Sequence, residues 1–283
     1  MKKELYTVTT INGKFVKRGQ DRISVFDNAL LYAEGLFETL LVIDGEIKFI
    51  NEHFKRLREG SKVLGVKIPV TKIVLLEWMK KTARAHPDKI LKLRLTVTSG
   101  EAARWTGVQG KQQIVISASP HAIPDFPFKL NVSKHRVDEQ SQFRRIKTTS
   151  YAIHAAALSK AKKLNCHDAL MINEKGNVAE ATSANIFWIK KNRVYTTPLS
   201  SGCLDGITRK AVMNDLDKFG FKVKEKDIKL SELTKAEEIF ITSSLKIVSP
   251  VGLIKHGAKT YRFEAGPITE IITRHYHKKF KLL

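Results

Sequence analysis

Cysteine is scarce in this chain of 283 residues, where Cys166 and Cys203 are the only two. Two cysteines make no disulfide framework, and these two lack the spacing of a paired metal ligand. The opening residues, MKKELYTV, hold no apolar core of the length that a signal peptide needs. The apolar runs elsewhere fall short of a membrane span. We therefore expect a cytoplasmic protein in a reducing compartment, with no membrane partner.

Motifs that mark several common enzyme classes are also absent. The sequence has no Gly-x-Gly-x-x-Gly run and no Walker loop, which argues against the common nucleotide-binding folds. It has no Gly-x-Ser-x-Gly, which argues against an α/β-hydrolase. His275 and His277 are two residues apart and diverge on a helix, and the other histidines lack partners at ligand spacing. The sequence predicts no metal site.

Acidic residues are few: the chain has 28 Asp and Glu against 50 Lys and Arg, which gives a net charge of +22. The basic residues are scattered, and no basic run is interleaved with aromatics as in a base-stacking surface. We therefore expect no nucleic-acid partner. A positive field would instead attract small anions, including phosphates. Hydrophobic residues make up 42% of the chain, enough for a substantial core.

Two short turns, Asn12-Gly13 and Asp44-Gly45, lie between β-rich runs and predict hairpins. Such hairpins indicate antiparallel pairing. Apolar periodicity predicts further strands at 90–98, 113–119, 128–132, 168–172, 185–189, 193–196, 238–242 and 248–254. It predicts helices at 54–64, 70–85, 151–164, 208–219 and 268–280. Helices and strands are mixed throughout, which favours the α+β class.

Three prolines fall within residues 120–127, which makes this stretch the best linker in the chain. The sequence therefore predicts a small α/β domain over 1–119, a linker over 120–127 and a larger domain over 128–283.

Lys147 and Glu180 carry the clearest chemical signal. A lysine amine can form a Schiff base with the aldehyde of pyridoxal 5'-phosphate (PLP). A carboxylate can bind the protonated pyridine nitrogen and keep the ring an electron sink. Glu180 opens a run of small and polar residues, typical of a flat ligand packed close to backbone. Either residue alone could equally be a surface charge or a helix cap.

Three further positions suggest a phosphate site. Gly206-Ile207-Thr208 is a turn entering a helix, whose free N–H groups and dipole attract anions. Residues 242–244 place three hydroxyls at a strand end, and Arg56 offers a bidentate donor. Taken singly, these positions could be an ordinary N-cap, a strand end and a surface arginine.

Taken together and in order, the motifs resemble the class IV aminotransferase family, the fold-type IV PLP enzymes. The family includes branched-chain and D-amino acid aminotransferases and aminodeoxychorismate lyase. The resemblance covers nearly the whole chain. Its motifs are 11–15 (INGKF), 35–39 (GLFET), 52–57 (EHFKRL), 146–148 (IKT), 178–187 (VAEATSANIF), 206–209 (GITR), 240–244 (FITSS) and 250–251 (PV).

The resemblance implies a two-domain, D-amino acid aminotransferase-like fold of α/β sandwich type, with PLP as cofactor. Lys147 would be the catalytic Schiff-base lysine and Glu180 the partner of the ring nitrogen. The implied phosphate ligands are Arg56, the backbone of Ile207 and Thr208, and Ser244. Tyr151 would lie against the ring hydroxyl. The resemblance also implies a homodimer whose substrate wall contains Tyr32, Phe37 and Arg94.

The family leaves the reaction open. We expect an aminotransferase that exchanges the amino group between an amino acid and a 2-oxo acid. The alternative is an aminodeoxychorismate lyase that releases pyruvate and 4-aminobenzoate, and the segments at 37–40 and 93–98 favour that branch. A binding protein without catalysis is a third reading, against which the presence of both Lys147 and Glu180 argues.

Overall fold

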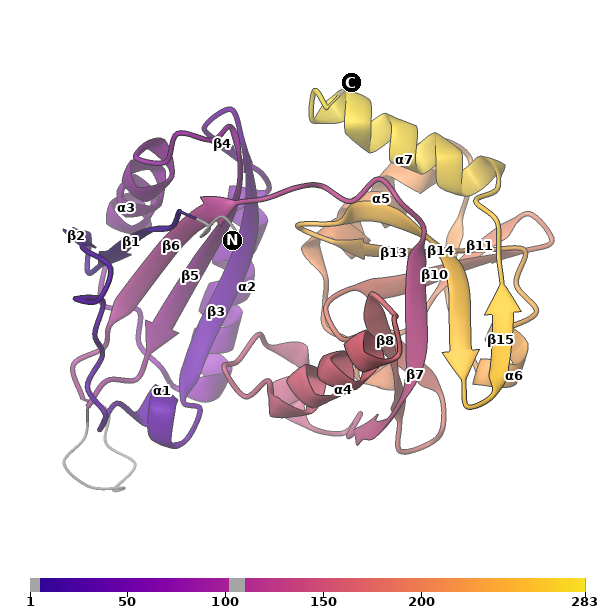
Figure 1. The fold of residues 1–283 in the computed structure, drawn as a ribbon, viewed down its shortest axis with the longest axis horizontal. Helices are drawn as coiled ribbons and strands as arrows, with labels where there is room; N and C mark the ends of the chain where they lie inside the picture. Colours follow the sequence, from indigo (N-terminus) through magenta and orange to yellow (C-terminus); the bar gives the residue numbers. More distant parts are fainter. Residues whose placement is uncertain (1–5, 102–109, 283) are drawn as a thin grey trace. The chain divides into compact units, whose positions relative to one another are not determined.

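A computed structural model describes residues 6–101 and 110–282 in two compact units. Unit 1 comprises Met1–Ala122 with Ile146–Ser150, and unit 2 comprises Ile123–Arg145 with Tyr151–Leu283. A domain boundary at the proline-rich linker would put residues 146–150 in the second domain. In the structure these residues pack with unit 1. Each unit has its own sheet and its own core (Figure 1).

Unit 1 is built on a six-stranded sheet with the order β2-β1-β6-β5-β3-β4, and its neighbouring strands pair antiparallel. Its strands are β1 (Val8–Ile11), β2 (Lys14–Val16), β3 (Gly35–Ile43), β4 (Glu46–Ile47), β5 (Ile90–Thr98) and β6 (Ile114–Pro120). Its helices are α1 (Asn28–Leu31), α2 (Ile50–Leu64) and α3 (Lys72–Arg84). Both predicted hairpin turns are confirmed, with φ of 49° and 76° at Asn12 and Gly13, and 49° and 78° at Asp44 and Gly45. These positive values are what a two-residue hairpin loop requires.

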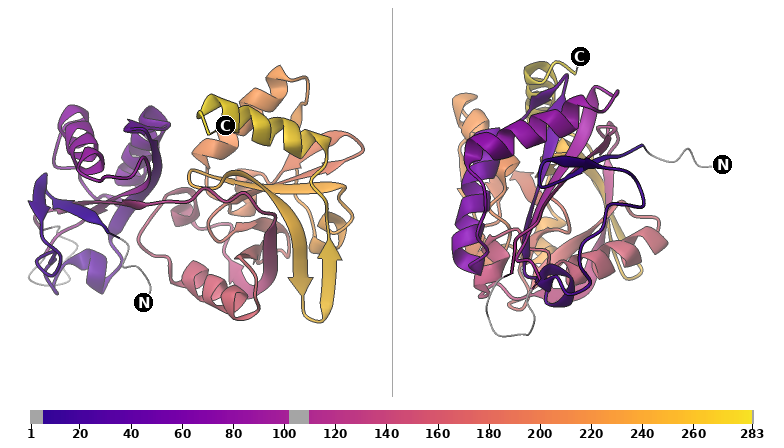
Figure 2. Two further views of the ribbon diagram at one scale, coloured as in Figure 1. Left: turned by 45° about the horizontal axis from the view of Figure 1, so that its top comes forward. Right: turned by 90° about the vertical axis from the view of Figure 1, so that its left-hand side faces the viewer.

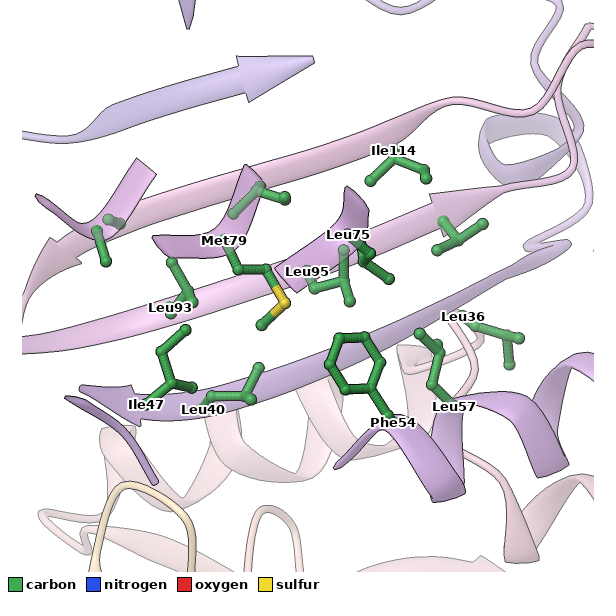
Figure 3. Packing of buried hydrophobic residues seen from close by; sticks show 14 of the residues in the cluster. Leu36, Leu40, Ile47, Phe54, Leu57, Leu75, Met79, Leu93, Leu95 and Ile114 are labelled. Carbon is green, nitrogen blue, oxygen red and sulfur yellow. The ribbon is translucent and has the colours of Figure 1, made fainter. Parts of the chain in front are cut away.

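The core of unit 1 follows from strand alternation. Every second residue of β5 from Leu91 to Val97 is buried, and helices α2 and α3 cover the same face of the sheet. Figure 3 shows Phe54 of α2 and Met79 of α3 packed against this row of leucines. Burying a side chain of this size contributes about 1.5–3 kcal/mol, so this cluster accounts for much of the stability of the unit.

Unit 2 is built on a nine-stranded sheet. Its strands are β7 (Phe128–Val137), β8 (Asp168–Asn173), β9 (Val178–Ala181), β10 (Asn185–Lys190), β11 (Arg193–Thr196), β12 (Val223–Glu225), β13 (Glu238–Ser243), β14 (Ile247–His256) and β15 (Lys259–Arg262). This sheet is mixed. Several of its pairs are antiparallel, the kind of pairing that the hairpins indicate, but β7 runs parallel to both β8 and β14, and β11 runs parallel to β12. The parallel neighbours are joined through long connections, which hairpin signals cannot reveal.

Helices pack on this second sheet. They are α4 (Ala152–Lys163), α5 (Ile207–Lys218), α6 (Leu230–Leu233) and α7 (Pro267–Lys279), with short 3-10 turns η1 (Gln142–Arg145) and η2 (Leu199–Ser201). Small side chains of α4, Ala157 and Ala161, bring that helix close to β7 and β8. Helices α5 and α7 pack on each other and on β13 (Figures 1 and 2). Among the described residues, no helix is both long and apolar enough to cross a membrane. The mixture of helices and sheets confirms the predicted α+β class.

Candidate functional site

The residues predicted for the site divide between the two units. Unit 1 carries Tyr32, Phe37, Arg56, Arg94 and Lys147, and unit 2 carries Tyr151, Glu180, Ile207, Thr208 and Ser244. The predicted carboxylate and helix end therefore belong to one unit, and the predicted amine belongs to the other.

Glu180 lies on β9, a four-residue strand whose residues are all buried, and its own exposed fraction is 6%. Its Oε2 accepts a hydrogen bond from the backbone N–H of Leu204 (3.0 Å), and its Oε1 accepts one from Arg144 Nη2 (2.5 Å). Burial opposes ionisation of this carboxyl, but His154 and Arg144 beside it lower the pKa of Glu180 below its ordinary value. The structure thus holds a buried carboxylate in its charged form.

Arg144 is fixed on three sides. Its Nε donates to the backbone carbonyl of Gly202 (2.9 Å), its Nη1 to His154 Nε2 (3.0 Å) and its Nη2 to Glu180. The Nε2 atom of His154 is 3.8 Å from Glu180 Oε1, too far for a hydrogen bond, so Arg144 is the direct partner. The guanidinium therefore orients the Glu180 carboxylate rigidly.

Tyr151 precedes α4 as its N-cap residue. Its ring stacks on the imidazole of His154, with 4.5 Å between centroids, and its hydroxyl donates to the carbonyl of Thr182 (3.1 Å). Tyr151 is therefore held against the same strand-and-turn region as Glu180, which precedes Thr182 by two residues.

The N-terminus of α5 is uncapped by any side chain, since the N-cap residue is Gly206. A Cβ atom on Gly206 would lie 1.9 Å from Asn185 Oδ1, so this approach requires glycine. Asn185 in turn donates to the carbonyl of Leu204 (2.8 Å), the residue whose N–H binds Glu180. One short loop therefore connects the buried carboxylate to the free end of a helix.

Two hydroxyls near this helix end have no hydrogen-bond partner among the described residues: Thr208 Oγ1 on the first turn of α5, and Thr242 Oγ1 on β13. The two residues are 2% and 1% exposed, so water does not satisfy them readily. Helix α5 packs on β13. Free N–H groups, a helix dipole and buried unpartnered donors are what a phosphate dianion binds.

The turn after β13 carries the predicted Ser244, which is half-buried. The neighbouring Ser243 Oγ accepts the backbone N–H of Lys246 (3.1 Å). The Lys246 amine donates to Ser183 (2.7 Å) and lies 3.5 Å from the buried carboxylate of Asp168. Lys246 thus ties this turn to the one that follows Glu180.

In unit 1, Lys147 is carried by a segment that pairs with the edge of β3. Its carbonyl accepts the N–H of Phe37 (2.9 Å), and Thr149 N–H donates to Gly35 (2.9 Å). The Lys147 amine lies 4.4 Å from the centroid of the Phe37 ring, and the Arg94 guanidinium carbon lies 3.9 Å from it. The structure therefore brings Lys147, Phe37 and Arg94 together.

Arg56, on α2, forms a two-pronged ion pair with the buried Glu38 of β3. His53, one turn earlier, bonds the same carboxylate through Nδ1 (2.7 Å). Burial opposes ionisation of Glu38, but Arg56 and then His53 lower its pKa to about 2. Burial also lowers the pKa of His53, which favours the neutral imidazole. The Arg56 side chain is 10% exposed and is thus held in a fixed direction.

Tyr32 follows α1 and is exposed. It ends a stretch of unit 1 whose large apolar side chains are exposed: Ile23, Val25, Phe26, Leu30, Leu31 and Tyr32. A stretch of this kind is typical of a surface that binds another protein.

Three partners of the predicted residues were not predicted: Arg144 and His154 beside Glu180, and Glu38 beside Arg56. For Glu38, its position within the GLFET motif was a signal in the sequence that could have marked it as a site residue. The contacts of Arg144 join η1, α4 and β9, and no spacing in the sequence relates those elements.

The described residues fit PLP in chemical type. The charged carboxylate of Glu180 suits a protonated pyridine nitrogen, and the end of α5 with Thr208 and Thr242 suits a phosphate. A primary amine for the aldehyde is present at Lys147. The observations behind this fit are the unpartnered hydroxyls and the start of α5, which no side chain caps.

Comparison with known proteins agrees with the family that the sequence motifs resemble. The sequence profile of the family described as amino-transferase class IV matches residues 35–254. A Methanocaldococcus jannaschii protein provisionally named a branched-chain-amino-acid aminotransferase is 31% identical over 246 residues, 85% of each chain. The aminodeoxychorismate lyase of Bacillus subtilis is 26% identical over 278 residues, 96% of this chain and 94% of that protein.

The solved structure of the branched-chain aminotransferase from the archaeon Thermoproteus uzoniensis superposes with a TM-score of 0.87. It is 24% identical, and the match covers 96% of this chain and 94% of that one. This likeness confirms the predicted fold-type IV architecture. Since the family profile spans most of the sequence, the chain belongs to the class IV aminotransferases.

Proposed function

We propose that this chain is a PLP-dependent aminotransferase that exchanges an amino group between an amino acid and a 2-oxo acid. The observation that carries the proposal is the pairing, within unit 2, of a buried ionised carboxylate with an uncapped helix end. Glu180 would bind the ring nitrogen. Arg56, the backbone of Ile207 and Thr208, and the hydroxyls of Thr208, Thr242 and Ser244 would hold the phosphate. Another branched-chain amino acid aminotransferase of this fold, solved in complex with N-(5'-phosphopyridoxyl)-L-glutamate, supports the same cofactor.

Covalent connectivity supports Lys147 as the lysine that binds the cofactor. Arg144, which hydrogen-bonds Glu180, is three residues before Lys147. An extended chain spans at most about 3.6 Å per residue, so the Cα atoms of Arg144 and Lys147 are at most about 11 Å apart. Tyr151 follows four residues later and contacts His154 and Thr182. In the sequence, Lys147 is therefore flanked by two residues that contact Glu180 or its neighbours within unit 2.

PLP supplies an aldehyde that joins to amines and a protonated ring that withdraws electrons from the carbon bearing the amino group. Lys147 Nζ would hold the cofactor and would serve as the general base for the proton on that carbon. Glu180 would accept the N–H of the ring nitrogen. Tyr151 would contact the ring hydroxyl, and Phe37 and Arg94 would face the substrate, with Arg94 as the donor to a substrate carboxylate.

We also propose a homodimer, in which Tyr32 belongs to the substrate wall. The exposed apolar residues between Ile23 and Tyr32 support this arrangement, because a monomer rarely leaves so many large apolar side chains of one stretch in water. Analytical ultracentrifugation tests the proposal: a monomer at micromolar concentration would contradict it.

The experiment for the cofactor is borohydride reduction of the protein after incubation with PLP, which makes the bond between the lysine and the cofactor permanent. Peptide mass spectrometry should find the modification on Lys147. Lys147→Ala should lose it and lower turnover by about 10²–10⁴ or more. Lys163→Ala, an exposed lysine of α4, is the control. A protein that stays colourless with PLP would favour a binding protein without catalysis.

The second candidate is aminodeoxychorismate lyase, favoured by the similarity to the Bacillus subtilis lyase over almost the full length of both chains. Two assays separate the candidates. Supplying aminodeoxychorismate and detecting 4-aminobenzoate tests the lyase, and supplying L- and D-amino acids with 2-oxoglutarate or pyruvate tests amino exchange. Turnover in the first assay alone would reject the aminotransferase.

A further inference from the structure

Each of the three guanidinium nitrogens of Arg144 donates a hydrogen bond to a partner within unit 2. The partners are the Gly202 carbonyl (2.9 Å), His154 Nε2 (3.0 Å) and Glu180 Oε1 (2.5 Å). The exposed fraction of its side chain is 17%, while the adjacent Arg145 is exposed. A guanidinium held at three points is a fixed positive charge, not a mobile one.

His154 completes this arrangement as an acceptor. Arginine has only donors, so the Nε2 atom of His154 carries a lone pair and the ring hydrogen is on Nδ1. That Nδ1 atom is buried and has no hydrogen-bond partner among the described residues. His154 therefore accepts from Arg144, and Arg144 is the cation in direct contact with Glu180.

Two further ionisable side chains near Glu180, those of Cys203 and Tyr151, cannot carry a positive charge. Cys203 lies in the loop that contacts the carboxylate, and burial, then Glu180 itself, raises the pKa of its thiol. Tyr151 stacks on His154 and donates its hydroxyl elsewhere. Without Arg144, the carboxyl would stay buried but lose its directly bonded cation, and burial raises the pKa of a glutamate.

Protonation of Glu180 would matter for the cofactor. A carboxylate accepts the N–H of a protonated pyridine, whereas a carboxylic acid donates to an unprotonated one and leaves the ring a weak electron sink. Each Glu180 oxygen accepts one hydrogen bond in the structure and can accept another. The carboxylate therefore keeps the capacity to accept a bond from the ring nitrogen while Arg144 stays in place.

We propose that Arg144 is a positioning residue that keeps Glu180 ionised and correctly oriented, so that the ring nitrogen of PLP meets a carboxylate across the working pH range. The inference rests on the proposed function. It assigns a role to Arg144, which lies three positions before Lys147. Arg144 would act on the ring through Glu180 and would not touch the cofactor.

The test is the affinity for PLP as a function of pH, measured by equilibrium dialysis with the full-length protein. The variants are Arg144→Gln, which removes the charge, and Arg144→Lys, which keeps it. Arg145→Gln is the matched control, because it removes an equal charge from the adjacent exposed position. A second probe is the deaza analogue of PLP, in which carbon replaces the ring nitrogen and Glu180 has nothing to accept.

In Arg144→Gln the pKa of Glu180 should rise, so the carboxyl is protonated on the acid side and recovers its charge as the pH increases. PLP affinity should fall relative to wild type by about 10- to 100-fold at mildly acidic pH and recover on the alkaline side. The deaza analogue should show no such pH-dependent loss. Arg144→Lys should recover most of the affinity, and Arg145→Gln should follow wild type.

Two outcomes would overturn the inference and leave the proposed function standing. One is an affinity of Arg144→Gln that parallels wild type at every pH. The other is a uniform loss for PLP and the deaza analogue alike, which would indicate a purely structural role. Failure of the wild-type protein to bind PLP at all would reject the proposed function, and this inference with it.

Discussion

The guanidinium of Arg56 donates two hydrogen bonds to the carboxylate of Glu38, from Nε to Oε1 at 2.8 Å and from Nη2 to Oε2 at 2.6 Å. The pair is buried between α2 and β3, so its loss should affect stability as well as function. A bidentate pair also fixes the direction of the arginine, which a point charge would not.

The first prediction concerns acid stability. The pKa of Glu38 is lowered from 4.5 to about 2, so this group stabilises the fold above pH 4.5, and that stability is lost as the pH falls towards about 2. Glu38→Gln should lower the free energy of unfolding at neutral pH by on the order of 3 kcal/mol, because it breaks the buried ion pair with Arg56. Its stability should also vary less with pH between 4.5 and 2.

Urea denaturation measured at several pH values checks this expectation. Glu46→Gln is the control, since Glu46 is an exposed partner of Lys48, and its loss should change stability by at most about 0.5 kcal/mol. Equal effects of the two substitutions would contradict the prediction.

The second prediction concerns Gly206. An added methyl group would lie 1.9 Å from Asn185 Oδ1, so Gly206→Ala should displace the loop and cost about 1–3 kcal/mol. PLP affinity should fall at the same time, because the loop carries the start of α5. Introducing Asn185→Ala into the same chain should remove part of the loss, and additive costs in a double-mutant cycle would show that the two residues do not collide.

The third prediction separates stability from binding. Thr208→Val and Thr242→Val remove buried hydroxyls that have no partner among the described residues, so the protein without cofactor should keep or gain stability, by up to about 1 kcal/mol. PLP affinity should nevertheless fall in both variants. Thr269→Val is the matched control, because its hydroxyl is likewise buried and unpartnered within the described part of the chain but lies on α7. An unchanged affinity in all three would refute the phosphate assignment.

The fourth prediction tests Arg94 as the donor to the substrate carboxylate. Arg94→Gln should raise KM for the amino acid by about 10- to 100-fold, the loss expected for a charge-assisted hydrogen bond. Lys92→Gln is the control, since Lys92 is the preceding basic residue on the same face of β5 and is exposed. If both variants have the KM of the wild-type protein, Arg94 does not contact the substrate.

Local chemistry explains which parts of the fold were predictable. Asn12-Gly13 and Asp44-Gly45 tolerate positive φ, and the alternation of β5 is visible in the sequence itself. Strand β9 was missed because its four residues, all buried, lie between a turn and a run of small polar residues that is typical of a loop.

The candidate site was predictable only in its separate pieces. The prediction of Lys147 and Glu180 rests on a resemblance of motifs, because a lysine or a glutamate alone carries little information in so charged a chain. The three contacts of Arg144 could not be predicted, since each depends on tertiary packing between elements distant in the sequence. Partners of buried charges are set by the fold, and charge spacing along the chain does not encode them.

The five residues Ile146–Ser150 extend the sheet of one unit while the chain on either side of them belongs to the other. No single cut in the gene therefore yields two complete halves. A fragment ending at residue 122 would lack the segment that pairs with Phe37, and a fragment starting at residue 123 would carry that segment without its sheet. Shuffling experiments with relatives must exchange this short insert together with the N-terminal part.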